Sequence, residues 1–168
     1  MFYDLGLKIA FIHVPRTAGV AITLAFKPHL GHGSGWDLAN LRHLSYHGMT
    51  TKLRLQKEPI RFFTVFRPFS DIVESYRRLI ERDKQLLLTG TTCFSEAWKS
   101  ILLTDDPIEE TFRRTGWPTE ENAWWRFWLG HANSKIRTLN FHTIEHDLAE
   151  LCRDWNLPPI KLAAEKVN

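Results

Sequence analysis

The sequence predicts an α/β fold in which a small parallel sheet is flanked by helices. Three apolar stretches of strand length, rich in β-branched and aromatic residues, lie at 8–14, 60–66 and 135–141. Each of them is followed by a stretch with the apolar spacing of a helix. Strands that alternate with helices favour βαβ crossovers, which place parallel strands side by side and helices on the faces of the sheet.

Length and composition favour one domain over residues 1–168, because 43% of the 168 residues are hydrophobic and can form a real core. The formal net charge of +3 suits an anionic ligand but does not require nucleic acid. No apolar run approaches the ~20 residues of a membrane span, and the start of the sequence lacks the pattern of a signal peptide. The two cysteines, Cys93 and Cys152, show neither a disulfide framework nor metal-ligand spacing. We therefore expect a cytoplasmic protein without a metal.

The first strand leads into a turn suited to an anion. Pro15 ends the strand because it removes a backbone donor, and small residues at 17–19 lead into a predicted helix over 17–27. This layout points several backbone N–H groups at one spot, where the helix N-terminus adds roughly half a positive charge. A phosphate is the natural occupant. An ordinary βα turn without a ligand is the alternative.

The second strand ends at Arg67, and Pro68 then stands where the first turn of a long helix is expected. Arg67 would direct a forked cation over the carboxyl edge of the sheet, where ligands bind in open parallel sheets. Ser75 follows about two helical turns later and would add a hydroxyl group to the same anion. The alternative is a structural arginine and an incidental serine.

Together, the two motifs resemble those of the sulfotransferases. Residues 12–19 read IHVPRTAG and are similar to the 5′-phosphosulfate loop of the branch that includes carbohydrate sulfotransferases, roughly HxPKTGGTS. Residues 63–76 read FTVFRPFSDIVESY and resemble the 3′-phosphate strand and helix, roughly FxVRNPxDRLVSxY. Residues 140–148 (NFHTIEHDL) resemble a later strand–helix junction of the family, whereas about 83–130 match nothing in it.

The resemblance implies a P-loop-like three-layer fold and the donor 3′-phosphoadenosine 5′-phosphosulfate. It implies metal-independent transfer of a sulfonyl group to a hydroxyl or amine, on a carbohydrate or small molecule. Arg67 and Ser75 would hold the 3′-phosphate. The residues that would hold the 5′-phosphosulfate are Pro15, Arg16, Thr17, Ala18, Gly19, Val20 and Ala21.

The loop also departs from the family pattern. Arg16 stands where the family usually has lysine, which keeps the charge but changes its geometry. Val20 and Ala21 replace hydroxyl residues, so two side-chain hydrogen bonds, each worth about 1–3 kcal/mol to a charged group, are missing. Donor affinity is therefore expected to be modest.

The transfer needs a cation at the leaving group and a base at the acceptor. Arg16 is the candidate to stabilise the charge on the leaving oxygen. His43 is the first candidate base, since it lies in a segment that resembles a histidine-containing stretch of the family and its usual pKa suits neutral pH. His47 is the rival and Glu58 a distant third. His13 is expected to be a packed residue.

The aromatic run at 124–128 reads WWRFW, and one or two of its rings are candidates to line an acceptor pocket. Packing between layers is the alternative for the others. Two other functions stay open. A divergent P-loop kinase is disfavoured because the Gly-Lys-Ser/Thr ending of its loop is absent. A catalytically inactive nucleotide-binding protein agrees with the substitutions at Val20 and Ala21.

Overall fold

The computed structural model describes residues 1–31, 35–36, 43–52, 59–92, 94–104 and 106–162. Contacts within the chain divide it into two compact units, the first formed by 1–67 with 125–168 and the second by 68–124. The expectation of a single domain over 1–168 stays a prediction. Among the helices in these ranges, none has both the length and the apolar character needed to cross a membrane.

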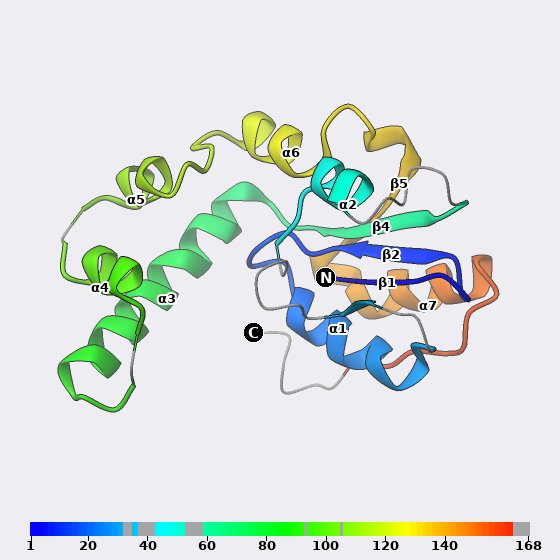
Figure 1. Cartoon of the computed structure of the whole chain (residues 1–168), viewed down its shortest axis with the longest axis horizontal. Coiled ribbons are helices and arrows are strands. Elements are labelled where there is room, and N and C mark those ends of the chain that lie inside the picture. The colour runs from blue at the N-terminus through cyan, green and yellow to red at the C-terminus, as the bar shows by residue number, and fades with distance from the viewer. Residues whose placement is uncertain (32–34, 37–42, 53–58, 93, 105, 163–168) are drawn as a thin grey trace. The chain divides into compact units, whose positions relative to one another are not determined.

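The first unit contains a mixed sheet of five strands in the order β3-β1-β2-β4-β5 (Figure 1). Strands β2, β4 and β5 are mutually parallel, as predicted. Strand β1, which the sequence reading missed, is antiparallel to both β2 and β3, so the prediction of a wholly parallel sheet is wrong. The strands are β1 (Phe2–Asp4), β2 (Ile9–Ile12), β3 (Gly35–Trp36), β4 (Arg61–Phe66) and β5 (Ile136–Asn140).

The missed pairing has a local cause. β1 has only three residues, too few to show an alternating pattern. A four-residue turn connects it to β2, and Lys8 at the end of that turn has a left-handed φ of 55°. The Asp4 side chain accepts a hydrogen bond from the Leu7 N–H at 2.8 Å and so closes the turn. A short connection of this kind produces an antiparallel pair, whereas parallel strands need a long crossover.

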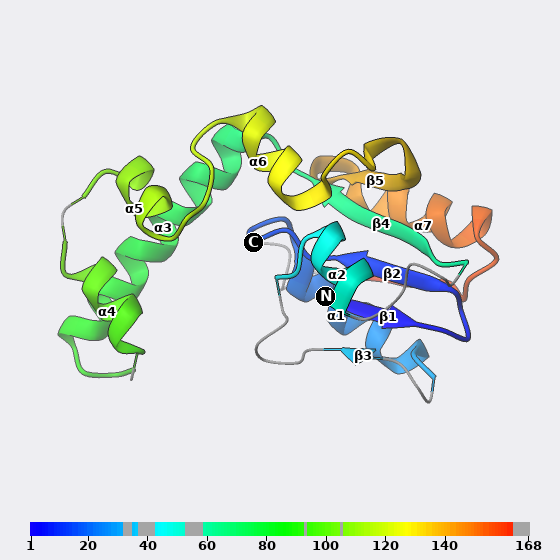
Figure 2. The same ribbon diagram turned by 45° about the horizontal axis from the view of Figure 1, so that its top comes forward.

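Helices cover both faces of this sheet. Helices α1 (Gly19–Phe26) and α7 (Ile144–Asp154) lie on one face and α2 (Tyr46–Lys52) on the other (Figures 1 and 2). The end of α6 (Glu121–Leu129), from residue 125 onward, also belongs to this unit. Short 3₁₀ turns precede β5 and α7 and follow α1; they are η3 (Asn133–Lys135), η4 (Phe141–Thr143) and η1 (Lys27–His29).

Because the strands are pleated, successive side chains point alternately to the face covered by α1 and α7 and to the face covered by α2. Phe11 and Phe63 face α1 and α7, and their ring centroids lie 5.0 Å apart in the main apolar cluster. Phe62, one position away, instead contacts Tyr46 of α2 edge-on at 5.0 Å. β2 is buried on both faces, which explains its unbroken apolar run. The first unit is therefore an α/β unit with helices on both sides of a mixed sheet.

The N-terminal ends of three helices show where the structure agrees with the sequence and where it differs. The first helix begins at Gly19 rather than at residue 17, because Ala18 has a left-handed conformation. Thr143 is the N-cap residue of the last helix, but its hydroxyl donates to the Asp147 carboxylate at 3.0 Å and makes no cap bond. Ser95 caps its helix, since its hydroxyl oxygen accepts from the Trp98 N–H at 3.3 Å.

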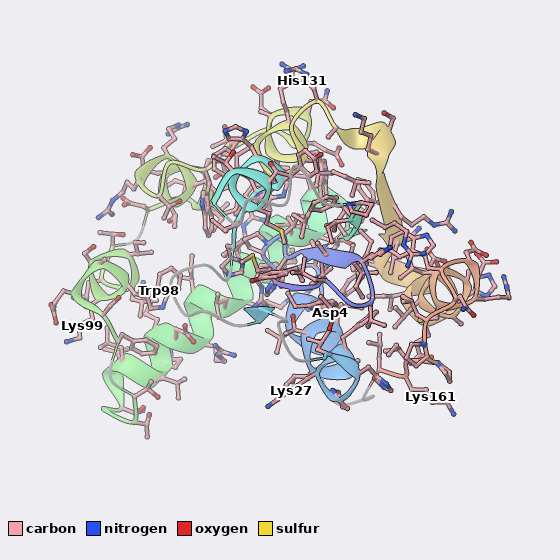
Figure 3. All side chains as sticks on the ribbon, turned by 45° about the vertical axis from the view of Figure 1, so that its right-hand side comes forward. Asp4, Lys27, Trp98, Lys99, His131 and Lys161 are labelled. Carbon is pink, nitrogen blue, oxygen red and sulfur yellow. The ribbon has the colours of Figure 1, made fainter. Side chains whose placement is uncertain are left out.

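The second unit is helical and contains α3 (Phe69–Leu88), α4 (Glu96–Leu102), α5 (Ile108–Arg114) and the start of α6. Trp98 of α4 donates its indole N–H to the buried carboxylate of Asp83 on α3 at 3.0 Å (Figure 3). Stacked and edge-on ring contacts join a cluster made of Phe69, Tyr76, Phe112, Trp117 and Trp124. This packing accounts for part of the aromatic run that the sequence left open.

Candidate functional site

The loop between β2 and α1 has an unusual backbone. Arg16 and Ala18 both have left-handed φ angles, 63° and 60°, whereas Thr17 between them does not. When the sign of φ alternates along the backbone in this way, successive N–H groups turn towards one side and form an anion-binding concavity. The left-handed conformation costs an L-residue about 1–2 kcal/mol, so surrounding contacts must maintain it.

Hydrogen bonds inside the loop provide some of those contacts. The Thr17 hydroxyl is fully buried and donates to the carbonyl oxygen of Val14 at 2.8 Å. The Thr23 hydroxyl donates to the Gly19 carbonyl oxygen at 2.7 Å, one turn into α1. Thr17 was predicted to be a donor-binding residue, and its hydroxyl bonds the loop itself. Its remaining contribution to an anion is the backbone N–H.

His13 packs directly against the start of α1. A Cβ atom added at Gly19 would lie 1.8 Å from Cδ2 of the imidazole ring, so only glycine fits this position. The His13 side chain is 4% exposed, and its ring stacks on Phe11 with a centroid distance of 5.9 Å. The expectation that His13 is a packed residue is therefore confirmed.

Arg67 joins the end of β4 to this loop. Its Nη1 donates a hydrogen bond to the backbone carbonyl oxygen of Arg16 at 3.0 Å. Its guanidinium carbon lies over the Phe141 ring, 4.1 Å from the centroid, which is within cation–π range. Arg67 therefore contacts the first motif through the loop backbone, whereas its predicted role in holding the 3′-phosphate stays a prediction.

His43 also contacts the loop. Its Nδ1 lies 3.2 Å from the His13 carbonyl oxygen, and a carbonyl only accepts, so Nδ1 carries the proton of this bond. In the neutral ring, Nε2 is then the nitrogen that accepts protons. The His43 ring is exposed and lies 4.6 Å from the His13 ring centroid and 6.4 Å from that of Trp128.

The other predicted site residues make no contact that assigns them a role in the site. His47 is on the exposed side of α2, and within the described residues its imidazole has no hydrogen-bond partner. Val20 is 51% exposed and Ala21 is buried. Pro15 is buried within the loop between β2 and α1. Glu58 lies outside the described residues.

Ser75 is buried on α3, which belongs to the second unit, whereas Arg67 belongs to the first. The prediction that these two side chains share one anion therefore stays a prediction. The geometry described for the loop rests on residues of the first unit alone.

The aromatic run at 124–128 is largely packed. Trp125 is 8% exposed and lies against Phe66, with ring centroids 4.8 Å apart. Trp128 is 2% exposed, whereas its neighbour Phe127 is 47% exposed. Within the described residues, the indole N–H of Trp125 has no hydrogen-bond partner. Only Phe127 of this run offers a free ring surface in the first unit.

Two contributors to the site were missed by sequence reasoning. Phe141 provides the ring beneath Arg67, and Thr64 ties the two central strands together through a 2.9 Å hydrogen bond to the Ile12 carbonyl oxygen. Neither contact has a sequence spacing that would reveal it, since each joins residues more than fifty positions apart. Across the described ranges, no group of three or more His, Cys, Asp or Glu side chains is placed to hold a metal ion.

Comparison with protein-family models, with curated proteins and with solved structures found no match for this chain.

Proposed function

We propose that this protein is a sulfotransferase that uses 3′-phosphoadenosine 5′-phosphosulfate as its donor. The observation that carries the proposal is the contact between Arg67 and the Arg16 carbonyl, at a loop whose alternating backbone suits a phosphate. It joins the two motifs that resemble the donor-binding motifs of the family. A histidine proposed as the base, His43, contacts the backbone of the same loop.

In the proposed reaction, the acceptor oxygen attacks sulfur as the bridging oxygen of the donor leaves in line. The bond from acceptor oxygen to sulfur forms, the bond from sulfur to the bridging oxygen breaks, and 3′,5′-adenosine bisphosphate departs with the electron pair. The Arg16 guanidinium stabilises the charge that grows on the leaving oxygen. His43 Nε2 takes the acceptor proton, while its Nδ1–H bond to the His13 carbonyl holds the ring in the required tautomer.

Donor binding is tested by calorimetric titration of 3′,5′-adenosine bisphosphate in EDTA. The proposal predicts saturable binding, and Arg16→Gln should weaken it about tenfold or more because a charge-assisted hydrogen bond is lost. Arg137→Gln is the matched control, since Arg137 is an exposed strand residue that pairs with Asp154 at 3.6 Å. Absence of binding to the unaltered chain would remove the sulfotransferase proposal at its first step.

The base is tested with His43→Asn, because the asparagine amide keeps an N–H donor for the His13 carbonyl but provides no base. Transfer from radiolabelled donor, screened over sugars, phenols, lipids and peptides, should fall by about 10²–10⁴ while bisphosphate binding is kept. His146→Asn on the exposed side of α7 is the control. Equal turnover of His43→Asn and the unaltered chain would exclude His43 as the base.

A nucleotide-binding protein without transfer activity is the second candidate. It is favoured by Val20, whose half-exposed apolar side chain stands at the start of α1 where a hydroxyl would reach the ligand. Bisphosphate binding without transfer to any acceptor would select this function. Binding of ATP that needs Mg²⁺ and exceeds bisphosphate binding would instead point to a kinase.

A further inference from the structure

A cavity of about 510 Å³ lies between α7 and the segment that follows it, residues 157–162. Its volume falls within the 300–1,000 Å³ that is usual for sites of small organic ligands. No residue of the loop at 13–21 lines it, so this α7 cavity is separate from the proposed donor site.

The inner wall of the α7 cavity is apolar and continuous with the core. Leu148, Cys152 and Ile160 are all less than 9% exposed and belong to the main apolar cluster. The apolar residues that line the cavity are Leu148, Ala149, Cys152, Leu157, Ile160 and Leu162. A hydrocarbon chain placed here would be removed from water, and this burial of apolar surface favours binding.

The segment across the cavity is attached to α7 at two points. Pro158 and Pro159 have φ angles fixed by their rings, which stiffens the segment. On one side of them, the Leu157 N–H bonds to the Cys152 carbonyl at 2.8 Å, and on the other the Ile160 N–H bonds to the Cys152 thiol. The prolines thus span the gap between two fixed points.

Three charged residues are among those that line the α7 cavity. Arg153, Lys161 and Glu145 line it, and Arg153 is paired with Glu150 at 3.4 Å. Within the described chain, the exposed Lys161 ammonium has no ion-pair partner (Figure 3). A second cavity, of about 470 Å³ against α1, is also lined by Lys161.

We propose that the α7 cavity binds a free single-chain amphiphile with an anionic head, such as a medium-chain fatty acid. The alkyl chain lies against Leu148, Cys152 and Ile160, and the carboxylate pairs with Lys161. This site does not depend on the proposed transfer reaction.

The test is a calorimetric titration with monomeric decanoate, compared with decylamine of equal chain length. Decanoate should bind saturably and more tightly than decylamine, and Lys161→Glu should reverse that order. In a Cys93→Ser background, bound decanoate should also slow the reaction of Cys152 with a maleimide by at least threefold, because the thiol lines the occupied cavity. If Lys161→Glu leaves the order unchanged, the assigned head-group partner is wrong.

The location is tested with Ala149→Trp, because Ala149 lines the cavity from an exposed position and a large ring there blocks the mouth without disturbing the core. Decanoate affinity should fall at least tenfold, with unchanged thermal unfolding. Ala97→Trp, at an exposed position of α4, is the matched control and should bind as the unaltered chain does. Equal binding in both variants, or no binding to the unaltered chain, would overturn the proposal.

Discussion

The Arg67 guanidinium donates a hydrogen bond to the backbone carbonyl of Arg16 at 3.0 Å. One cationic residue therefore fixes the backbone of another, at a point where that backbone is left-handed. This contact links the carboxyl ends of two adjacent parallel strands through the loop that leaves one of them. It gives the phosphate-loop hypothesis a geometric basis that neither motif provides alone.

Arg67→Ala should weaken both the fold and the loop, because it removes the bond to Arg16 and the contact with the Phe141 ring. We expect the free energy of unfolding to fall by about 1.5–3 kcal/mol, as for hydrogen bonds to charged groups, when measured by urea denaturation. Arg67→Lys keeps the charge but not the planar fork and should recover only part of this loss. Arg137→Ala, which removes only the exposed ion pair with Asp154, should cost less than about 1 kcal/mol.

Gly19→Ala should displace the loop, since the new methyl group would overlap the His13 ring at 1.8 Å. Overpacking of this kind typically costs about 1–3 kcal/mol, and bisphosphate binding should fall with it. The double variant His13→Ala, Gly19→Ala should cost less than the sum of the two single changes. Gly48→Ala is the control, because a Cβ atom added there would lie nearest to the flexible end of Leu44, at 3.2 Å. If the losses of the two single variants simply add in the double variant, the overlap with the His13 ring is not the cause of the Gly19→Ala loss.

Val20→Ser should raise bisphosphate affinity if the proposed donor site is right. The side chain is 51% exposed at the start of α1, so the substitution leaves no cavity and offers a hydroxyl to the bound anion. A gain of about 0.5–1.5 kcal/mol, or about two- to tenfold in the dissociation constant, is expected by calorimetry. Ala21→Ser is the contrasting variant, because Ala21 is 3% exposed and its hydroxyl would be buried.

Stability should fall at alkaline pH through Cys152. Burial raises the pKa of this thiol above its ordinary value of 9.0, whereas the unfolded chain keeps the ordinary value. Above pH 9.0 the unfolded state therefore loses its proton first, and the free energy of unfolding decreases as pH rises towards the folded pKa. Below pH 9.0 this contribution is constant.

The measurement is urea denaturation of the unaltered chain and of Cys152→Ala between pH 7 and pH 10, in a Cys93→Ser background. The difference in unfolding free energy between the two chains should be constant at neutral pH and shrink above about pH 9. A difference that does not change with pH would show that the thiol titrates alike in both states.

The parallel core of the fold could be read from the sequence because its strands lie in stretches rich in β-branched and aromatic residues that are followed by helical patterns. Strand β1 could not, since it has three residues and its pairing depends on a turn closed by Asp4. The cap at Ser95 can be predicted from the sequence, because the serine oxygen accepts a hydrogen bond from the Trp98 N–H only three residues on. Thr143 also stands at the N-cap position of its helix, but its hydroxyl makes no cap bond and donates to Asp147, four residues on.

At the candidate site, the sequence determined the residue types and the order of the two motifs, because a strand followed by small residues and a helix is a local pattern. Tertiary structure alone decided that Arg67 bonds the Arg16 carbonyl and that His43 presents Nδ1 to His13. These contacts depend on which strands lie side by side and on the handedness of two loop residues. No local spacing encodes either, since both result from packing between segments distant in the sequence.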